Sequence, residues 1–184
     1  MIPGWRSIPP QPGEICSRRL IHSKTRKSSR DDVRICPESC LMEIVIGSDH
    51  AGFDLKNRCI SHIEGLAGIA VRDIGVFDKK SADYPEVAHR LAADVADGKF
   101  SRGILICGSG IGMSIVANRH KGVRAALCHN LYLARMARMH NDANILVMGE
   151  RVIGWGLALE MVDVFLETRF EGGRHRRRLD QIDY

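Results

Sequence analysis

The amino-acid sequence predicts an α/β fold in which a five-stranded parallel sheet lies between two layers of helices. Five short apolar runs are each long enough for a buried strand, and they lie at 43–47, 69–74, 103–107, 123–128 and 144–148. Helical patterns separate these runs, and strands that alternate with helices pair in parallel. We therefore expect a three-layer α/β/α sandwich over residues 42–184, with Met42 at the start of the first strand.

The segments between the runs carry apolar residues at helical spacing. In the first of them the intervals are four, four and three residues, through Leu55, Cys59, Ile63 and Leu66. Further helices are expected around 87–95 and near 112–119, 130–140 and 155–168. Open sheets of this kind bind ligands beyond the carboxyl ends of their strands. Side chains that directly follow the runs are therefore the first candidates for a site.

We predict that residues 1–41 form a disordered N-terminal extension. They contain five of the six prolines and a Ser/Lys/Arg patch at 23–30, and such a segment cannot bury enough apolar surface to offset chain entropy. An Arg- and Ser-rich transit peptide is an alternative, although Asp31, Asp32 and Glu38 weaken it. The segment could also reflect a start site placed upstream of the true one.

The formal net charge of +5 arises mostly in this extension. Residues 1–42 carry eight lysines and arginines against four acidic residues, whereas the remainder carries nineteen against eighteen. The folded part is nearly neutral, which argues against nucleic-acid binding. No apolar stretch reaches the ~18 residues of a membrane helix, so we expect no membrane partner. The six cysteines show no disulfide pattern, which favours a reduced, cytoplasmic protein.

Cys107 ends the third apolar run and is followed at once by the glycine loop Gly108-Ser109-Gly110-Ile111-Gly112. Such a loop bares its backbone N–H groups before a helix, whose partial positive charge favours thiolate over thiol and holds oxyanions. The spacing is neither a dinucleotide fingerprint nor a nucleotide P-loop. A structural turn and an inert core thiol are the plain alternatives. Cys107 and the Ser109 hydroxyl together favour a site.

Two pairs of residues beside the expected strands have both a functional and a structural interpretation. Asp49 and His50 follow the first strand, where Asp49 could orient a substrate, cap the helix, or do both. His140 and Asn141 close a basic helix, where the histidine could be a surface cap or a general acid–base group.

The basic tail holds a third candidate group. Arg174 and Arg178 lie four residues apart after a double glycine, so a helix resuming there would place both guanidinium groups on one face. Paired guanidinium groups suit a phosphate. A solvated basic tail is the alternative, and the neutral folded part offers no wider surface for nucleic acid.

Five motifs then occur in the order typical of one enzyme family. They are Gly47-Ser48-Asp49-His50-Ala51-Gly52-Phe53, Asp83-Tyr84-Pro85, Ile106-Cys107-Gly108-Ser109-Gly110-Ile111-Gly112, His140-Asn141-Asp142-Ala143-Asn144 and Glu171-Gly172-Gly173-Arg174-His175. Over about residues 42–184 the chain resembles the type B ribose-5-phosphate isomerases of the ribose/galactose isomerase family. The resemblance implies a Rossmann-like fold, a reaction without metal or cofactor, and a homodimer, or a tetramer of two dimers, with active sites between subunits.

The resemblance also implies a role for each residue of the glycine loop. Cys107 would be the base that takes the proton from C2 of open-chain ribose 5-phosphate. Ser109 and the loop backbone would steady the enediolate and help to return a proton to C1; the loop residues are Gly108, Gly110, Ile111 and Gly112. Many relatives have threonine where this chain has Ser109, and the hydroxyl is kept.

The remaining implied roles concern the sugar ring and the phosphate. His140 would open the furanose ring with the help of Asn141. Asp49 and Tyr84 would contact sugar hydroxyls or the ring. The phosphate would be bound by His50, Arg174 and Arg178, with Arg151 in the same cleft.

The expected function is thus the aldose–ketose isomerisation of ribose 5-phosphate and ribulose 5-phosphate, a step of the non-oxidative pentose phosphate pathway. A close alternative is another phosphosugar, such as galactose 6-phosphate, allose 6-phosphate or erythrulose 4-phosphate. From other classes, a non-catalytic phosphate-binding module and a redox-sensing thiol protein remain alternatives; the second lacks a resolving cysteine nearby in sequence.

Overall fold

The structure, a computed structural model, describes residues 41–182. Its first half comprises strand β1 (Met42–Ser48), the 3₁₀ helix η2 (His50–Gly52), helix α1 (Phe53–Glu64), strand β2 (Ile69–Asp73), helix α2 (Tyr84–Ala96) and strand β3 (Arg102–Cys107). Its second half comprises α3 (Ile111–Ala117), β4 (Ala125–Leu127), α4 (Leu131–Asn141), β5 (Ile145–Gly149), α5 (Trp155–Glu167) and α6 (Arg174–Leu179). The predicted N-terminal extension, except for Leu41, lies outside the described residues.

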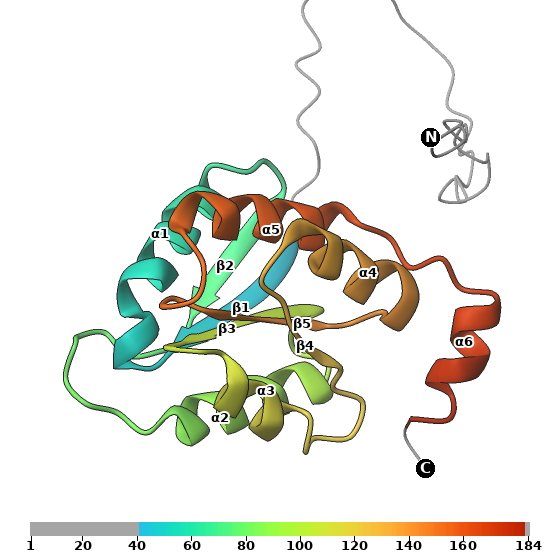
Figure 1. Cartoon of the computed structure of the whole chain (residues 1–184), viewed down its shortest axis with the longest axis horizontal. Coiled ribbons are helices and arrows are strands. Elements are labelled where there is room, and N and C mark those ends of the chain that lie inside the picture. The colour runs from blue at the N-terminus through green and yellow to red at the C-terminus, as the bar shows by residue number, and fades with distance from the viewer. Residues whose placement is uncertain (1–40, 183–184) are drawn as a thin grey trace, which may run out of the picture. The chain divides into compact units, whose positions relative to one another are not determined.

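All five strands form one parallel sheet in the order β2-β1-β3-β5-β4 (Figure 1). The α/β prediction and the five-stranded parallel sheet are therefore confirmed. The chain winds in opposite directions from β1 and β3, because β2 lies outside β1 whereas β5 and β4 lie beyond β3. In open sheets this point of reversal is where ligands bind.

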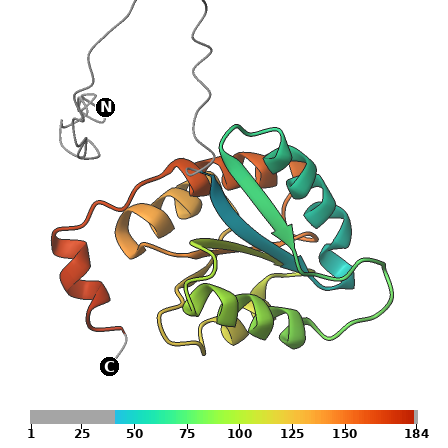
Figure 2. The same ribbon diagram turned by 180° about the vertical axis from the view of Figure 1, so that it is seen from behind.

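Apolar side chains cover both faces of the sheet, because successive residues of a strand point to opposite sides. Ile44, Ile46 and Ile104 lie in one core cluster with residues of α1, α4 and α5. Val45 and Leu105 lie in a second cluster with residues of α2 and α3. Figures 1 and 2 show these two helical layers on opposite sides of the sheet, which is the predicted three-layer sandwich.

The fourth strand is shorter than its apolar run indicated, since β4 spans Ala125–Leu127 rather than 123–128. Val123 belongs instead to a turn, where its N–H donates to the carbonyl of His120 at 3.1 Å. The Asn118 side chain donates to the carbonyl of Ala125 at 2.8 Å and accepts from its N–H at 2.9 Å. This side chain satisfies part of the strand backbone that a further strand would otherwise pair with.

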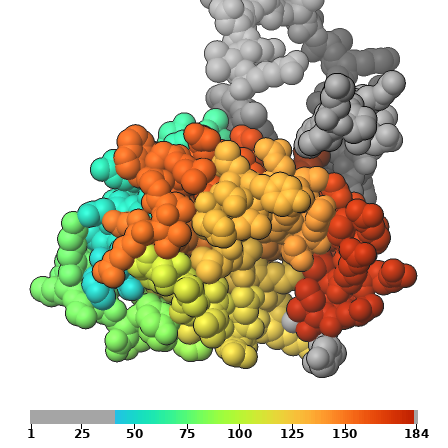
Figure 3. Space-filling view, in the orientation of Figure 1, coloured from blue at the N-terminus to red at the C-terminus, as the bar shows by residue number. Residues whose placement is uncertain are grey.

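The C-terminal segment lies beside the end of α4. The Glu171 N–H donates to the carbonyl of Met139 at 3.0 Å, which joins the connection after α5 to the last turn of α4. Figure 3 shows α6 next to α4 on the molecular surface. Of the two alternatives for the basic tail, the structure shows the helix: Arg174 and Arg178 lie on α6. Each helix of residues 41–182 is too short or too polar to cross a bilayer.

Candidate active site

The carboxyl ends of the neighbouring strands β1 and β3 lie side by side, and they bring Asp49 and Cys107 to the same end of the sheet. Ser48 pairs with Ile106 across the two strands, and the Asp49 N–H donates to the Ile106 carbonyl at 3.3 Å. Two segments that are far apart in sequence therefore meet where the winding of the sheet reverses. This is the position at which the sequence placed its first candidates.

Asp49 caps the helical turn that follows β1. Its Oδ1 accepts from the backbone N–H groups of Ala51 at 2.9 Å and Gly52 at 3.0 Å, and the side chain is almost fully buried. The capping role that the sequence suggested is therefore confirmed. Both of these bonds use Oδ1, which leaves Oδ2 for a substrate hydroxyl. The next residue, His50, accepts at Nδ1 from the Ala82 N–H at 3.2 Å, and this bond fixes its ring.

Cys107 is 5% exposed at the end of β3, and the loop that follows turns back onto its sulfur. The Gly110 N–H donates to Cys107 Sγ at 3.0 Å, a contact that becomes stronger when the sulfur carries negative charge. Gly110 reaches this position with a φ of 80°, and a side chain there would also collide with Leu127. The glycine is required for the sulfur to receive its donor.

The other two cysteines of the described residues lie in apolar surroundings. Burial raises the pKa of Cys59 to about 12, with a smaller contribution from Glu150. Burial also raises the pKa of Cys128 to about 11. Both remain thiols at neutral pH, so neither is available as a base.

The loop after β5 brings Arg151 to the glycine loop. The Glu150 N–H donates to the Cys107 carbonyl at 2.9 Å, and the Arg151 N–H donates to the Gly108 carbonyl at 3.0 Å. The guanidinium carbon of Arg151 lies 3.6 Å from the position that a Cβ on Gly108 would occupy. A cation is therefore held against the backbone of the loop.

Tyr84 closes the opposite side of the loop from the first position of α2. Its ring packs against Gly112, where an added Cβ would lie only 2.6 Å from two ring atoms. The side chain is 39% exposed, so its hydroxyl remains accessible to a ligand. Gly112 thus admits the aromatic ring.

These residues line a cavity of about 680 Å³. Its lining contains nine of the predicted site residues, namely Asp49, His50, Tyr84, Cys107, Gly108, Ser109, Ile111, Gly112 and Arg151. The cavity lining also includes Ala51, Ile115 and Val152, which the sequence had not singled out. Gly110 contributes its N–H to the sulfur from behind the loop.

The other four predicted residues do not line this cavity. His140 and Asn141 close α4, which starts after β4 and runs back toward the amino end of β5. Arg174 and Arg178 are exposed on α6, which packs beside that end of α4. Because Cys107 stands at the carboxyl ends of the strands, these four residues and the Cys107 cavity lie at opposite ends of the strands. One copy of the chain therefore does not bring all the predicted site residues together.

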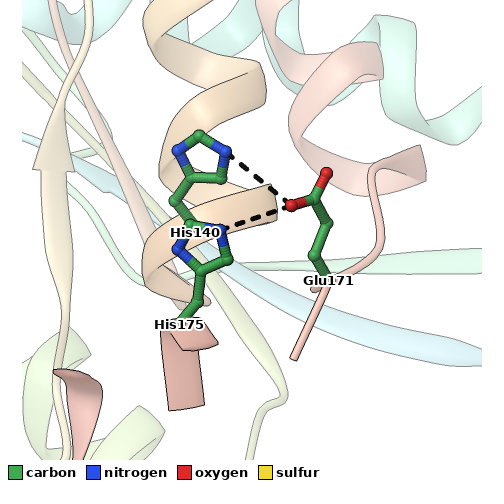
Figure 4. A group of neighbouring side chains, drawn as sticks. All are labelled: His140, Glu171 and His175. Carbon is green, nitrogen blue, oxygen red and sulfur yellow. Dashed lines mark ion pairs between the residues drawn. The ribbon is translucent and has the colours of Figure 1, made fainter. Parts of the chain in front are cut away.

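His140 stacks on His175, a residue to which the sequence had assigned no role (Figure 4). The ring centroids are 4.2 Å apart and the rings are within 6° of parallel. Glu171 faces both imidazoles, with Oε2 at 3.8 Å from His140 Nε2 and 3.4 Å from His175 Nε2. The Glu171–His175 motif was visible in the sequence, but its separation from His140 concealed the contact.

Two histidines and a glutamate are a donor set that zinc accepts, and the donor atoms lie within 4.8 Å of one another. The ring geometry does not suit a shared ion, however. A metal binds an imidazole along the nitrogen lone pair in the ring plane, and parallel stacked rings direct their lone pairs side by side rather than to one point. The geometry of the trio therefore does not favour a metal site.

The sequence and the fold match one enzyme family. A profile of the Ribose/Galactose Isomerase family matches residues 44–182. The chain is 43% identical over 142 residues to "Ribose-5-phosphate isomerase B" of Escherichia coli K12, covering 77% of this chain and 95% of that relative. It is also 43% identical over 146 residues to "D-erythrulose-4-phosphate isomerase" of Pectobacterium atrosepticum, covering 78% and 95%.

Solved structures give the same result. The ribose-5-phosphate isomerase B of Clostridium thermocellum is 49% identical, with a TM-score of 0.75 over 77% of this chain and 95% of that structure. The type B enzyme of Trypanosoma brucei is 42% identical, with a TM-score of 0.75 over 77% and 97%. A parallel sheet with a thiol and a glycine loop at its switch point, together with these matches, places the chain in the Ribose/Galactose Isomerase family as a sugar-phosphate isomerase.

Proposed function

We propose that this enzyme interconverts D-ribose 5-phosphate and D-ribulose 5-phosphate, the isomerisation of the non-oxidative pentose phosphate pathway, with Cys107 as the base. The observation that carries the proposal is the Cys107 sulfur itself: it receives an amide N–H and lines a cavity with Asp49, Tyr84 and Arg151. The names of the E. coli relative and of the C. thermocellum structure support the same substrate.

The reaction moves one proton between neighbouring carbons. The Cys107 thiolate takes the proton from C2 of the open-chain aldose, and the electrons of that C–H bond form a C1=C2 double bond while O1 becomes negative. O1 then gains the proton of the C2 hydroxyl, C2=O forms, and the sulfur returns a proton to C1. Backbone N–H donors and Ser109 would hold the oxyanion, and losing one such donor typically costs about 3–4 kcal/mol.

We propose that two copies of the chain complete each active site. The cavity around Cys107 holds His50 and the Arg151 guanidinium as candidate phosphate ligands, but it does not include His140, the proposed acid for opening the ring. His140 and the Arg174–Arg178 pair of the partner subunit would supply that group and further cations. Ile111, Ile115 and Val152 on the cavity rim are more than half exposed, as suits an apolar surface that a second copy covers.

A second substrate has a specific observation in its favour. The P. atrosepticum relative that is 43% identical is named for erythrulose 4-phosphate. Contacts of Asp49 and Tyr84 with the sugar hydroxyls would decide between a tetrose, a pentose and a hexose phosphate. Galactose 6-phosphate and allose 6-phosphate belong to the same comparison.

The direct test is an assay of the purified enzyme, without added metal, against ribose 5-phosphate, erythrulose 4-phosphate, galactose 6-phosphate and allose 6-phosphate. We expect kcat/KM to be highest for ribose 5-phosphate. A higher value for any of the other three would replace the proposed substrate while leaving the isomerase assignment in place.

Replacement of the proposed base tests the mechanism. Cys107→Ala removes the group that carries the proton, so we expect kcat to fall about a thousandfold with little change in KM. Cys128→Ala is the matched control, because Cys128 is equally buried but lies outside the cavity. Turnover of Cys107→Ala within tenfold of the wild-type enzyme would refute Cys107 as the base.

A catalytic thiolate has to stay reduced. Cys59, Cys107 and Cys128 are free thiols, and we propose that the enzyme works in the reducing cytoplasm. Mapping the oxidation state of Cys107 in protein isolated under acid quench would test this; a disulfide at Cys107 would contradict it.

A further inference from the structure

The stacked pair of His140 and His175 is held by its neighbours on two sides. His175 is 5% exposed, and the Arg174 Nε donates to its Nε2 at 3.3 Å. Arg124 fixes the end of α4 on the other side, since its Nε donates to the carbonyl of Asn141 at 2.9 Å. His140 itself remains about one-third exposed, with its ring against the buried one.

The surroundings decide which of the two imidazoles can carry charge. Burial lowers the pKa of His175, and His140, Arg174 and Arg178 lower it further, against a raising influence from Glu171. Two parallel imidazolium rings 4.2 Å apart would also repel each other. The Nε2 of His175 already accepts from Arg174, whereas the Nε2 of His140 faces the Glu171 carboxylate at 3.8 Å, so the geometry favours His140 as the donor of the pair.

We propose that Glu171 and His175 are positioning residues for His140 in the ring-opening step, an inference that rests on the function proposed above. The His175 ring fixes the plane of the His140 ring by stacking. The Glu171 carboxylate supports the imidazolium form of His140. Neither residue needs to touch the substrate.

In the two-copy site proposed above, ring opening needs one proton donor and one proton acceptor. The His140 imidazolium gives its proton to the ring oxygen as the bond between C1 and that oxygen breaks. The proton of the C1 hydroxyl passes to Asp49 Oδ2 in the facing subunit, and its bonding electrons form C1=O. Ring opening thus needs His140 protonated and aligned at the start, which is what Glu171 and His175 provide.

The charged and titratable groups beside the stacked pair come from two parts of the chain. Glu171, Arg174, His175 and Arg178 belong to the C-terminal segment, and Arg124, Arg138 and Asp142 form an ion-paired group at the end of α4. Glu171 is the carboxylate that faces the imidazole of His140. Replacing Glu171 by a neutral amide should therefore remove the negative charge that faces the imidazole of His140.

The first variant is Glu171→Gln, with Glu167→Gln as a matched control that removes the same charge from an exposed position of α5. We expect turnover of ribose 5-phosphate at pH 7.5 to fall about tenfold in Glu171→Gln, with the alkaline limb of its pH profile at lower pH. The NMR titration of the His140 ring should move in the same direction. Glu167→Gln should leave all three unchanged.

A second readout separates ring opening from proton transfer at carbon. Ribulose 5-phosphate cannot close a furanose ring, because O5 carries the phosphate, so exchange of its C1 hydrogen with deuterated water needs Cys107 but not ring opening. We expect this exchange to stay within about twofold of wild type in Glu171→Gln. His175→Ala should behave like Glu171→Gln, and His175→Phe, which keeps an aromatic ring, should restore most of the turnover.

The possible results lead to different conclusions. An unchanged His140 titration and an unchanged ribose 5-phosphate profile in Glu171→Gln would overturn the proposal, and so would an equal loss of conversion and exchange. A wild-type enzyme that neither converts ribose 5-phosphate nor exchanges the C1 hydrogen of ribulose 5-phosphate would instead refute the proposed function. The His140 titration would then still decide whether Glu171 positions the ring.

Discussion

Cys59, Cys107 and Cys128 show how the surroundings of one residue type decide its chemistry. Cys59 and Cys128 lie in the apolar cluster between the sheet and the layer formed by α1, α4 and α5. Cys107 is nearly as buried, yet its sulfur lines the cavity and accepts an N–H from Gly110. Fractional burial alone does not separate these thiols. The donor and the adjoining cavity do.

Alkylation should therefore distinguish them. With iodoacetamide at pH 8, we expect Cys107 to be modified well before Cys59 and Cys128, because burial raises the pKa values of the latter two to about 12 and about 11. Peptide mass spectrometry over time measures the three rates. Protein unfolded in urea is the control, in which all three should react alike. Faster labelling of Cys59 or Cys128 in the folded protein would contradict the assignment.

The same two thiols make stability depend on pH. Their pKa values in the folded protein lie above the value of 9.0 for an unperturbed thiol, so the folded state holds these protons more tightly than the unfolded state does. Their stabilisation is complete below pH 9 and is lost as pH rises toward 11 and 12. The loss is at most about 1.4 kcal/mol per pH unit and thiol. Urea unfolding between about pH 8 and 10.5 should show a weaker decline in Cys59→Ala than in wild type; equal slopes would refute this.

At the scale of elements, a buried lysine joins α1 to the connection that leads into α2. Lys56 is 0% exposed, and its Nζ donates to Asp73 at 2.5 Å and to the carbonyl of Val76 at 2.8 Å. The aromatic rings of Phe53 and Phe77 lie beside the ammonium group. The connection between β2 and α2 continues from Val76 to Ala82, which bonds His50, and to Tyr84, which lines the cavity. Lys56 therefore holds the start of a segment that forms part of the cavity wall.

Lys56→Met should leave the Asp73 carboxylate without its partner and release Val76. We expect the free energy of unfolding to fall by about 2–3 kcal/mol, with a raised KM because Tyr84 is held less firmly. Lys79→Met is the control: its ion pair with Asp54 is exposed on both sides, so its removal should cost less than about 0.5 kcal/mol. Similar stabilities for the two variants in urea unfolding would contradict this account of Lys56.

Much of the site was predictable from sequence because its parts follow strands. The apolar runs located β1 and β3, and parallel pairing then brought Asp49 and Cys107 to one edge. The contact of His140 with His175 was not predictable, since it depends on how α6 packs against α4. Lys56 was missed for a similar reason: a lysine in an amphipathic helix is usually solvated, and only the fold shows Asp73 beside it.

At the scale of the whole molecule, the fold places Cys107 and His140 at opposite ends of the strands, and the proposed function has to bring them together. Cys107 stands beyond the carboxyl ends of the strands, whereas His140 closes a helix that returns to their amino ends. The mechanism proposed above needs both groups, so on that proposal two copies combine, and each gives its Cys107 to one site and its His140 to the other. Such an exchange is reciprocal in a two-fold dimer.

Mixing two inactive variants tests this claim most directly. Cys107→Ala and His140→Ala should each lack ribose 5-phosphate isomerase activity alone. After co-refolding in equal amounts, half of the dimers should contain one of each chain, with one site intact, so about a quarter of the wild-type activity should return. If the mixture stays inactive although mass measurement confirms mixed dimers, Cys107 and His140 do not serve one site across two subunits, and the account is contradicted.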